Sequence, residues 1–123
     1  MPTPETIERF VALVEANTHV EAVESFYAAD VAMHENQSAP RVGRDLAIAN
    51  ERSLLKRAKS IHSQCIRPVI VNGDHVAIRW VFEFQWLDGT RTRMEEVAWQ
   101  RWQDERIVEE TFFYDPAQRV PQS

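Results

Sequence analysis

The chain has 123 residues, of which 44% are hydrophobic and 27% charged, as is typical of one globular domain and not of a disordered segment. The formal charge of -5, with basic residues interspersed among acids, argues against nucleic acid, because phosphate binding needs a basic face. No apolar run approaches the roughly 20 residues of a membrane span, and the first residues lack a signal-peptide pattern. We therefore expect a single cytoplasmic domain over residues 1–123, with no membrane partner.

Residues that could hold a metal or form a disulfide are few. Cys65 is the single cysteine, which excludes an internal disulfide and a multi-thiolate zinc site. The four histidines, at positions 19, 34, 62 and 75, are dispersed and lack the local spacing of a metal centre. We predict no metal site and no cofactor.

Two helices are predicted at the start of the chain. Thr3 followed by proline is typical of a helix start, since the hydroxyl caps a free amide and proline loses no hydrogen bond there. Apolar residues at helical spacing continue this helix to Asn17. Thr18 and Glu21 form a capping-box pattern for a second helix, and Tyr27 is expected on its apolar face.

A short strand is predicted over residues 31–36 and a third helix over about residues 45–59. Glu51 falls in the middle of the apolar stripe of this helix. A carboxylate is costly there unless it is paired or its pKa rises. Glu51 is therefore either an acid of raised pKa or the partner of a side chain such as an arginine.

From Ser60 the hydrophobic residues alternate with polar ones, which predicts strands. The turn sequences NG at 72–73, DG at 88–89 and QDER at 103–106 divide this region into a meander of long strands. The pattern ends at Pro116 and leaves a polar tail. We predict an α+β fold, a cone-shaped curved antiparallel sheet covered by three N-terminal helices, with a pocket inside the cone.

Three segments, ESFYAADVAMHEN, RVGRDLAIA and RIVEETFFYD, follow one another in an order that resembles the nuclear transport factor 2-like superfamily. The resemblance is to its SnoaL-like and ketosteroid-isomerase-like members and covers about residues 3–116. It implies a cystatin-like roll, a small hydrophobic ligand in the cone, and a homodimer formed through the sheet. The outer face of the sheet would then carry Val81 with Val97 or Trp99.

The resemblance to ketosteroid isomerase implies one catalytic residue, because the carboxylate base of that enzyme matches Glu35 here. The two oxyanion donors of the isomerase match Val11 and Ala98, neither of which can donate a hydrogen bond. Steroid isomerisation itself is therefore disfavoured. His34 is adjacent to Glu35 on the predicted strand and should point to the opposite face.

The strand that follows the DG turn, TRMEEVAWQRW, contains two adjacent acids, Glu95 and Glu96. The strand register decides which of them enters the pocket. A strict two-residue turn places one set inward: Glu95, Val97 and Trp99. A single bulge places the other set inward: Glu96, Ala98, Gln100 and Trp102. In the family, the aromatic residue two positions before this turn faces inward, which favours the second set. Bulges are also common in strongly bent sheets.

These considerations select two groups of residues. The catalytic candidates are Glu35, Glu96 and Tyr114. The expected pocket-lining residues are Tyr27, Glu51, Trp80, Phe82, Gln100, Trp102 and Phe112. The Tyr114 hydroxyl could donate to a ligand or orient a glutamate, or belong to a core tyrosine. We expect a cofactor-independent isomerase, lyase or cyclase with a carboxylate base; the alternatives are a non-catalytic binder of a small ligand and a dimerisation module.

Overall fold

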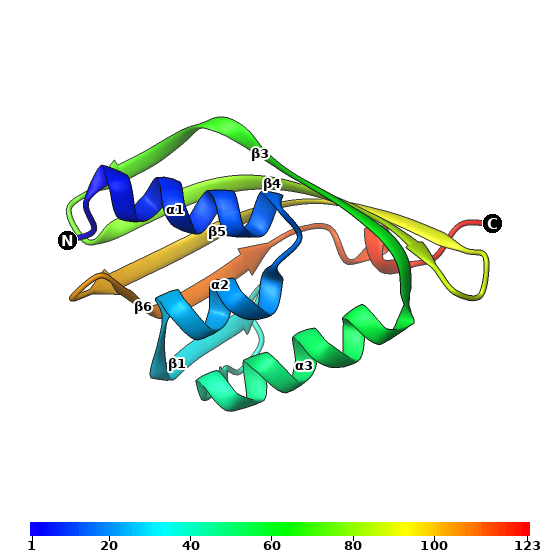
Figure 1. Ribbon diagram of the computed structural model, residues 1–123, viewed down its shortest axis with the longest axis horizontal. Coiled ribbons are helices and arrows are strands. Elements are labelled where there is room, and N and C mark those ends of the chain that lie inside the picture. The colour runs from blue at the N-terminus through cyan, green and yellow to red at the C-terminus, as the bar shows by residue number, and fades with distance from the viewer.

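The computed structural model describes all 123 residues and contains three helices over one face of a six-stranded sheet (Figure 1). The helices are α1 (Pro4–Glu15), α2 (His19–Phe26) and α3 (Arg44–Arg57). The strands are β1 (Tyr27–Glu35), β2 (Arg41–Val42), β3 (Ala58–Asn72), β4 (His75–Trp86), β5 (Arg91–Gln103) and β6 (Arg106–Phe113). A 3-10 helix, η1 (Pro116–Arg119), follows β6.

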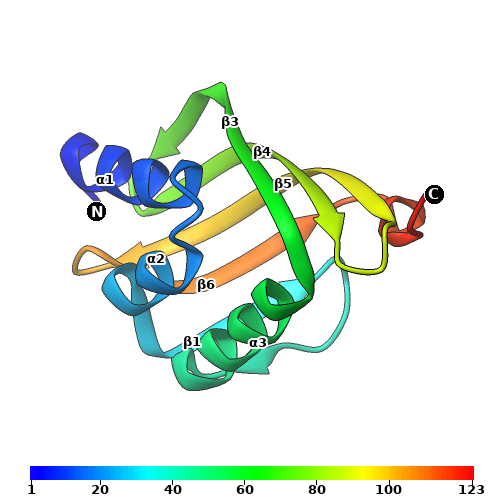
Figure 2. The ribbon, with the colours of Figure 1, turned by 45° about the vertical axis from the view of Figure 1, so that its right-hand side comes forward.

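The sheet order is β2-β1-β6-β5-β4-β3, and every neighbouring pair is antiparallel except β1 and β6, which are parallel. The predicted α+β class with three N-terminal helices over a curved sheet is confirmed. The sheet is mixed and not wholly antiparallel as predicted, because the last strand, β6, comes back beside β1 and runs parallel to it. The turned view shows β3 rising from the end of α3 and bending over toward α1, so that the sheet curves around the helices (Figure 2).

Helix starts follow the sequence signals in part. The Thr3 hydroxyl accepts a hydrogen bond from the Thr6 amide at 3.1 Å, as expected of an N-cap. The predicted capping box at Thr18 is wrong, because this hydroxyl donates to the Leu13 carbonyl instead. Asn17 has a φ of 64°, which turns the chain sharply between α1 and α2.

Two predicted helix ends are also wrong. The second helix stops one residue before Tyr27, which begins β1 with extended backbone. The third helix ends at Arg57 and not at Lys59, because Ala58 already pairs with Trp86 of β4. In both places tertiary strand pairing competes successfully with local helix propensity.

The hairpins determine the register of the long strands. Residues 73–74 join β3 to β4, one position beyond the predicted turn, and residues 104–105 join β5 to β6 with φ values of 52° and 62°. Trp86 and Thr90 extend the β4–β5 pairing by one position, since the Trp86 amide donates to the Thr90 carbonyl at 2.8 Å, and this leaves a three-residue loop, 87–89. This longer loop pairs Trp80 with Glu96.

The hydrophobic core lies between the helices and the concave face of the sheet. Phe10, Phe26 and Trp102 form its centre, with edge-to-face ring contacts at 5.7 to 6.3 Å. The polar C-terminal segment continues beyond β6 and is mostly exposed. It forms η1 and then pairs Gln122 with Arg91 of β5. No helix combines the length and apolar character that crossing a membrane requires.

Candidate functional site

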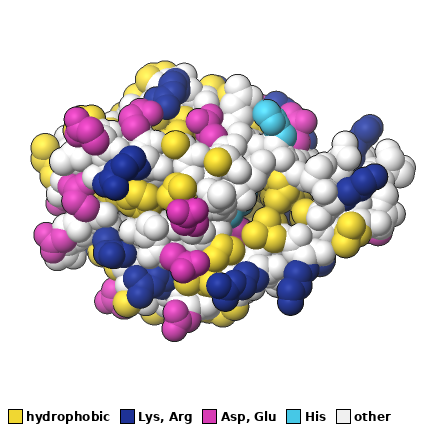
Figure 3. All heavy atoms as spheres, viewed as in Figure 1, with side chains coloured by type: hydrophobic (Ala, Val, Ile, Leu, Met, Phe, Trp, Pro, Cys, Tyr) yellow, Lys and Arg dark blue, Asp and Glu magenta, His cyan; other side chains and the backbone are white.

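A cavity of about 830 Å³ opens between the helices and the concave face of the sheet. Hydrophobic side chains gather around its opening, between the helical layer and the β4–β5 hairpin (Figure 3). Four aromatic residues follow one another along one face of β4, with ring centroids 5.5, 6.5 and 4.8 Å apart; the first and last pairs are stacked and the middle pair is tilted. These are Trp80, Phe82, Phe84 and Trp86. They form a continuous apolar wall that suits a small organic ligand.

The structure separates the candidate residues into three groups. Those that line the cavity are Tyr27, Glu35, Glu51, Trp80, Phe82, Glu96 and Phe112. Tyr114 lies beside the cavity and contacts it through Glu35. Gln100 and Trp102 were also expected to line the cavity, but neither is among its lining residues; both lie buried behind them. His34 lies outside the cavity, with Nδ1 3.1 Å from the Ser38 carbonyl.

The β4–β5 register brings Glu96 to the cavity. β4 and β5 pair in the second of the two registers considered, so Glu95 points to the outer face and contacts Arg93 at 3.2 Å. The predicted bulge is absent, because the pairing runs without a shift from His75 to Gln85. This outcome depends on the three-residue loop after β4, since one residue fewer would reverse every side chain of β5.

Glu35 is surrounded by hydrogen-bond donors from three segments. Tyr114 Oη donates to Oε1 at 2.8 Å, and Arg41 Nη2 donates to Oε2 at 3.2 Å. Arg119 of η1 donates to the Tyr114 hydroxyl at 3.1 Å and lies 4.0 Å from Glu35 Oε1. All of these groups donate, so Glu35 serves as a hydrogen-bond acceptor at the cavity wall. The packing of the C-terminal segment onto β5 is what brings Arg119 here.

Glu96, unlike Glu35, is surrounded mainly by burial and by other carboxyl groups. Burial, together with the charges of Glu35, Glu110 and Glu51, raises the pKa of Glu96 from 4.5 to about 8. The only opposing influence of note is Arg119, which lowers it. Glu96 therefore carries a proton at neutral pH and can donate it.

A buried hydrogen-bond chain runs behind the cavity. The Trp102 indole N–H, which can only donate, bonds Gln100 Oε1 at 2.9 Å. This orients the Gln100 amide so that Nε2 donates to Glu110 Oε2 at 2.6 Å, while Tyr27 Oη donates to Glu110 Oε1. Burial raises the pKa of Glu110 to about 7, although both hydrogen bonds oppose the rise.

Glu110 was not among the residues selected from the sequence, yet it lines the cavity and is 1% exposed. The signal that could have found it is the two-residue alternation of β6, which puts it on the same face as Phe112. His19 was missed as well. It lines the cavity from the start of α2, where no local pattern distinguishes it from a surface residue.

The Tyr27 hydroxyl is expected to contribute measurably to stability. Tyr27→Phe leaves an acceptor of Glu110 without its donor inside the core, so the free energy of unfolding should fall by about 1–3 kcal/mol. The pKa of Glu110 should rise, because this bond lowers it in the native protein. Urea titration measures the first effect. Tyr114→Phe, at a half-buried position, is the matched control and should cost clearly less; an equal cost would contradict the assigned role.

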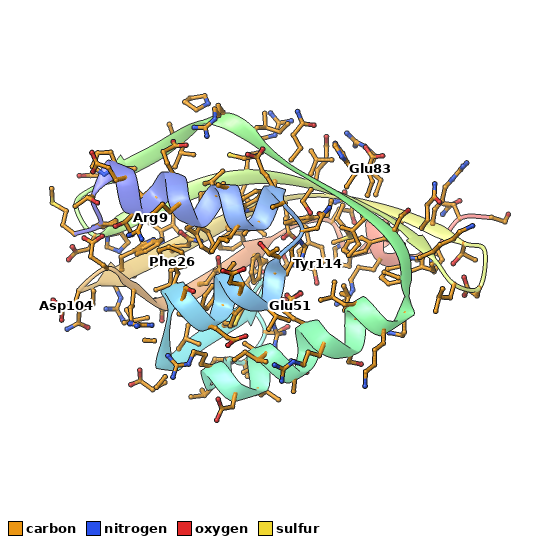
Figure 4. The ribbon with its side chains drawn as sticks, in the orientation of Figure 1. Arg9, Phe26, Glu51, Glu83, Asp104 and Tyr114 are labelled. Carbon is orange, nitrogen blue, oxygen red and sulfur yellow. The ribbon has the colours of Figure 1, made fainter.

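Glu51 lies next to a histidine and not next to an arginine. Its Oε2 atom lies 3.7 Å from His19 Nδ1, and both residues line the cavity. Glu51 and Tyr114 are labelled in Figure 4, where both lie toward the middle of the molecule, away from Asp104 at the β5–β6 turn. No group of three or more His, Cys, Asp or Glu side chains has an arrangement that could hold a metal ion.

A helix-covered curved sheet around an aromatic cavity with several carboxyl groups defines a protein of the nuclear transport factor 2-like, ketosteroid-isomerase-like fold. The chain belongs to the SnoaL-like domain family, whose sequence model matches residues 7–110. None of the curated proteins matches this sequence.

Solved structures share the fold at low sequence identity. A candidate SnoaL-like polyketide cyclase from Mesorhizobium loti is 24% identical, with a TM-score of 0.76 over 93% of this chain and 100% of that one. A ketosteroid isomerase-like protein from Catenulispora acidiphila, in complex with trimethylamine, is 20% identical, with a TM-score of 0.76 over 94% and 89%. An LEH-like epoxide hydrolase from Mycobacterium tuberculosis is 14% identical, with a TM-score of 0.75 over 93% and 83%. These likenesses concern the fold.

Proposed function

We propose that the cavity binds a small, largely apolar carbonyl compound and catalyses a proton transfer on it without a cofactor. The observation that carries this proposal is the contrast between two neighbouring carboxyl groups. Glu35 accepts hydrogen bonds from surrounding donors, and Glu96 is a carboxylic acid with a pKa of about 8. Environments that separate two acids in this way are typical of a general base and a general acid.

The proposed step uses both groups. Glu35 takes a proton from the carbon next to the carbonyl, the electron pair of that bond moves toward the carbonyl oxygen, and this oxygen receives the proton of Glu96. Return of the proton from Glu35 to the same carbon, and of the enol proton to Glu96, gives exchange; in a carbonyl compound with a β,γ double bond, return to the γ carbon moves the double bond into conjugation and completes an isomerisation. Glu96 thereby supplies the donor that Val11 and Ala98 lack, since both are fully buried apolar residues. SnoaL-like family membership supports chemistry of this class.

Hydrogen–deuterium exchange on a probe ketone tests the proposal. 2-Tetralone has an aromatic body suited to the β4 wall and an enolisable carbon beside its carbonyl. In heavy water, proton NMR should show loss of that proton signal faster with the protein than with buffer alone. Binding without any acceleration, for this ketone and a panel of enolisable analogues, would overturn the enzymatic proposal.

A non-catalytic binder is the second candidate function. The stacked aromatic wall of β4 is a preformed apolar surface, which is sufficient to hold a ligand without any reaction. Native mass spectrometry of the purified protein distinguishes the two functions. A binder would copurify with an intact small molecule and would leave the probe ketone unexchanged.

We further propose a homodimer formed through the outer face of the sheet. Three large apolar side chains are exposed there, Val97, Trp99 and Phe113, at 39%, 47% and 41%. Val81 shares this face and is already buried. Charges of both signs surround the three exposed residues, namely Arg79, Arg101, Glu95 and Glu109. A second copy, related by a twofold axis, would cover the apolar centre and match opposite charges at its margin.

Trp99→Glu tests the dimer. Placing a carboxylate in the centre of the patch should weaken association at least about tenfold and shift the protein toward monomer at micromolar concentration. Sedimentation velocity measures the shift. Val42→Glu, at an exposed position of β2, is the control and should not change it. A wild-type protein that sediments only as a monomer would contradict the proposed dimer.

A further inference from the structure

His19 occupies a defined position between the cavity and a buried hydrogen-bond relay. It is 8% exposed at the start of α2, and its ring contacts Phe82 edge to face at 5.7 Å. Nε2 lies 3.0 Å from the Ser63 hydroxyl on β3, whereas Nδ1 faces Glu51 on α3. The two ring nitrogens therefore point to different surroundings, one inside the protein and one beside the cavity.

The relay determines which nitrogen carries the proton. The Asn17 amide nitrogen donates to the Ile61 carbonyl at 3.0 Å, which leaves Asn17 Oδ1 as an acceptor. Ser63 Oγ donates to that oxygen at 2.7 Å. A hydroxyl has one proton, so Ser63 must accept from His19 at 3.0 Å, and Nε2 is the protonated nitrogen. In neutral His19, Nδ1 then has a free lone pair.

The Nδ1 lone pair lies next to a second acceptor. Glu51 Oε2 is 3.7 Å away, which is too far for a direct hydrogen bond. Both residues line the cavity, and Phe82 lies against the His19 ring. The cavity therefore presents two acceptor atoms side by side, next to an aromatic surface, at a place distinct from the Glu35–Tyr114 contact.

We propose that His19 Nδ1, beside the Glu51 carboxyl, forms a second polar site of the cavity and accepts the O–H hydrogen bond of a hydroxyl-bearing ligand. The aromatic or apolar body of that ligand rests on Phe82 and its hydroxyl points to Nδ1. This inference rests on the proposed function only in placing the ligand in this cavity. It requires nothing of Glu35 or of a reaction.

A matched pair of probes tests the site. Phenol can donate a hydrogen bond to Nδ1, and anisole, its methyl ether, cannot. The wild-type protein should bind phenol about three- to tenfold more tightly than anisole, in the range of a neutral hydrogen bond. His19→Phe keeps the ring against Phe82 and should abolish this preference. His62→Phe, at an exposed position of the same strand as Ser63, is the control and should retain it.

Nitrogen-15 NMR of the histidine rings gives a readout on the unaltered protein. His19 should show a protonated Nε2 and an unprotonated Nδ1, and phenol should shift Nδ1 while anisole leaves it in place. Ser63→Ala removes the acceptor of Nε2–H and should produce a mixture of tautomers. A protonated Nδ1 in neutral wild-type His19, or equal affinity for the two probes, would overturn the proposal, as would failure of both probes to bind. Glu35→Gln should keep the phenol preference, which separates failure of this site from failure of the proposed catalysis.

Discussion

Replacing Glu35 by Gln is expected to lower protein-catalysed exchange of the probe ketone by about 10²–10⁴-fold, the usual contribution of a positioned general base. The amide has nearly the shape of the carboxylate and can still accept from Tyr114 or Arg41 through its oxygen. It cannot take a proton from carbon. The exchange rate of the variant, measured by proton NMR at equal protein concentration, gives the size of the loss.

Glu109→Gln is the matched control for this experiment. Glu109 is exposed on the outer side of β6 and does not line the cavity, so its replacement should leave the exchange rate unchanged. Equal unfolding midpoints of the two variants would show that the loss is not caused by unfolding. If Glu35→Gln retained the full exchange rate, Glu35 would not be the base.

The second large effect concerns the dependence of stability on pH. Glu96 has a native pKa of about 8 against 4.5 in the unfolded chain. Below pH 4.5 the carboxyl is protonated in both states. Between these values the unfolded chain releases the proton and the native protein keeps it, so the free energy of unfolding falls as pH rises. Above about pH 8 the loss is complete.

Glu96→Gln removes a charge that the native cavity disfavours. The variant should match the wild type near pH 4, and above pH 8 it should exceed the wild-type free energy of unfolding by up to about 5 kcal/mol, which is the equivalent of the whole pKa shift. It should keep a smaller fall with pH that comes from Glu110, whose pKa is about 7. Urea titrations across this range measure both differences.

Glu95→Gln is the natural control, because Glu95 is adjacent in sequence and pairs with Arg93 on the outer face. Its replacement should not produce the gain in stability at high pH. A wild-type protein whose stability stays level between pH 5 and pH 8 would show that Glu96 is ionised throughout, and the assignment of Glu96 as the acid would fail.

Much of the fold was predictable because its signals are local. The start of α1 follows from Thr3 and the proline after it, and the hairpins follow from short turn sequences between alternating strands. The order of the three segments quoted above was enough to predict a nuclear transport factor 2-like fold. Glu35 was selected as a candidate from the same resemblance, because it ends the strand that carries the carboxylate base in the family pattern.

Tertiary structure alone decided which polar groups meet. A three-residue loop after β4 sets the register that turns Glu96 inward, and the packing of η1 brings Arg119 to Glu35. Sequence patterns specify on which face of a strand a residue lies, but not how deep it lies. Gln100 and Trp102 are on the predicted face of β5, but they lie deeper than the cavity wall. Their face was predictable and their depth was not.

The chain by itself determined a helix-covered curved sheet with an aromatic interior, because periodicity and turn chemistry depend on neighbours in sequence. Four acids from four separate elements meet around one cavity: Glu35, Glu51, Glu96 and Glu110. Whether Glu96 and Glu110 hold or release a proton depends on their burial and on the charges around them. Those quantities exist only once the chain has folded.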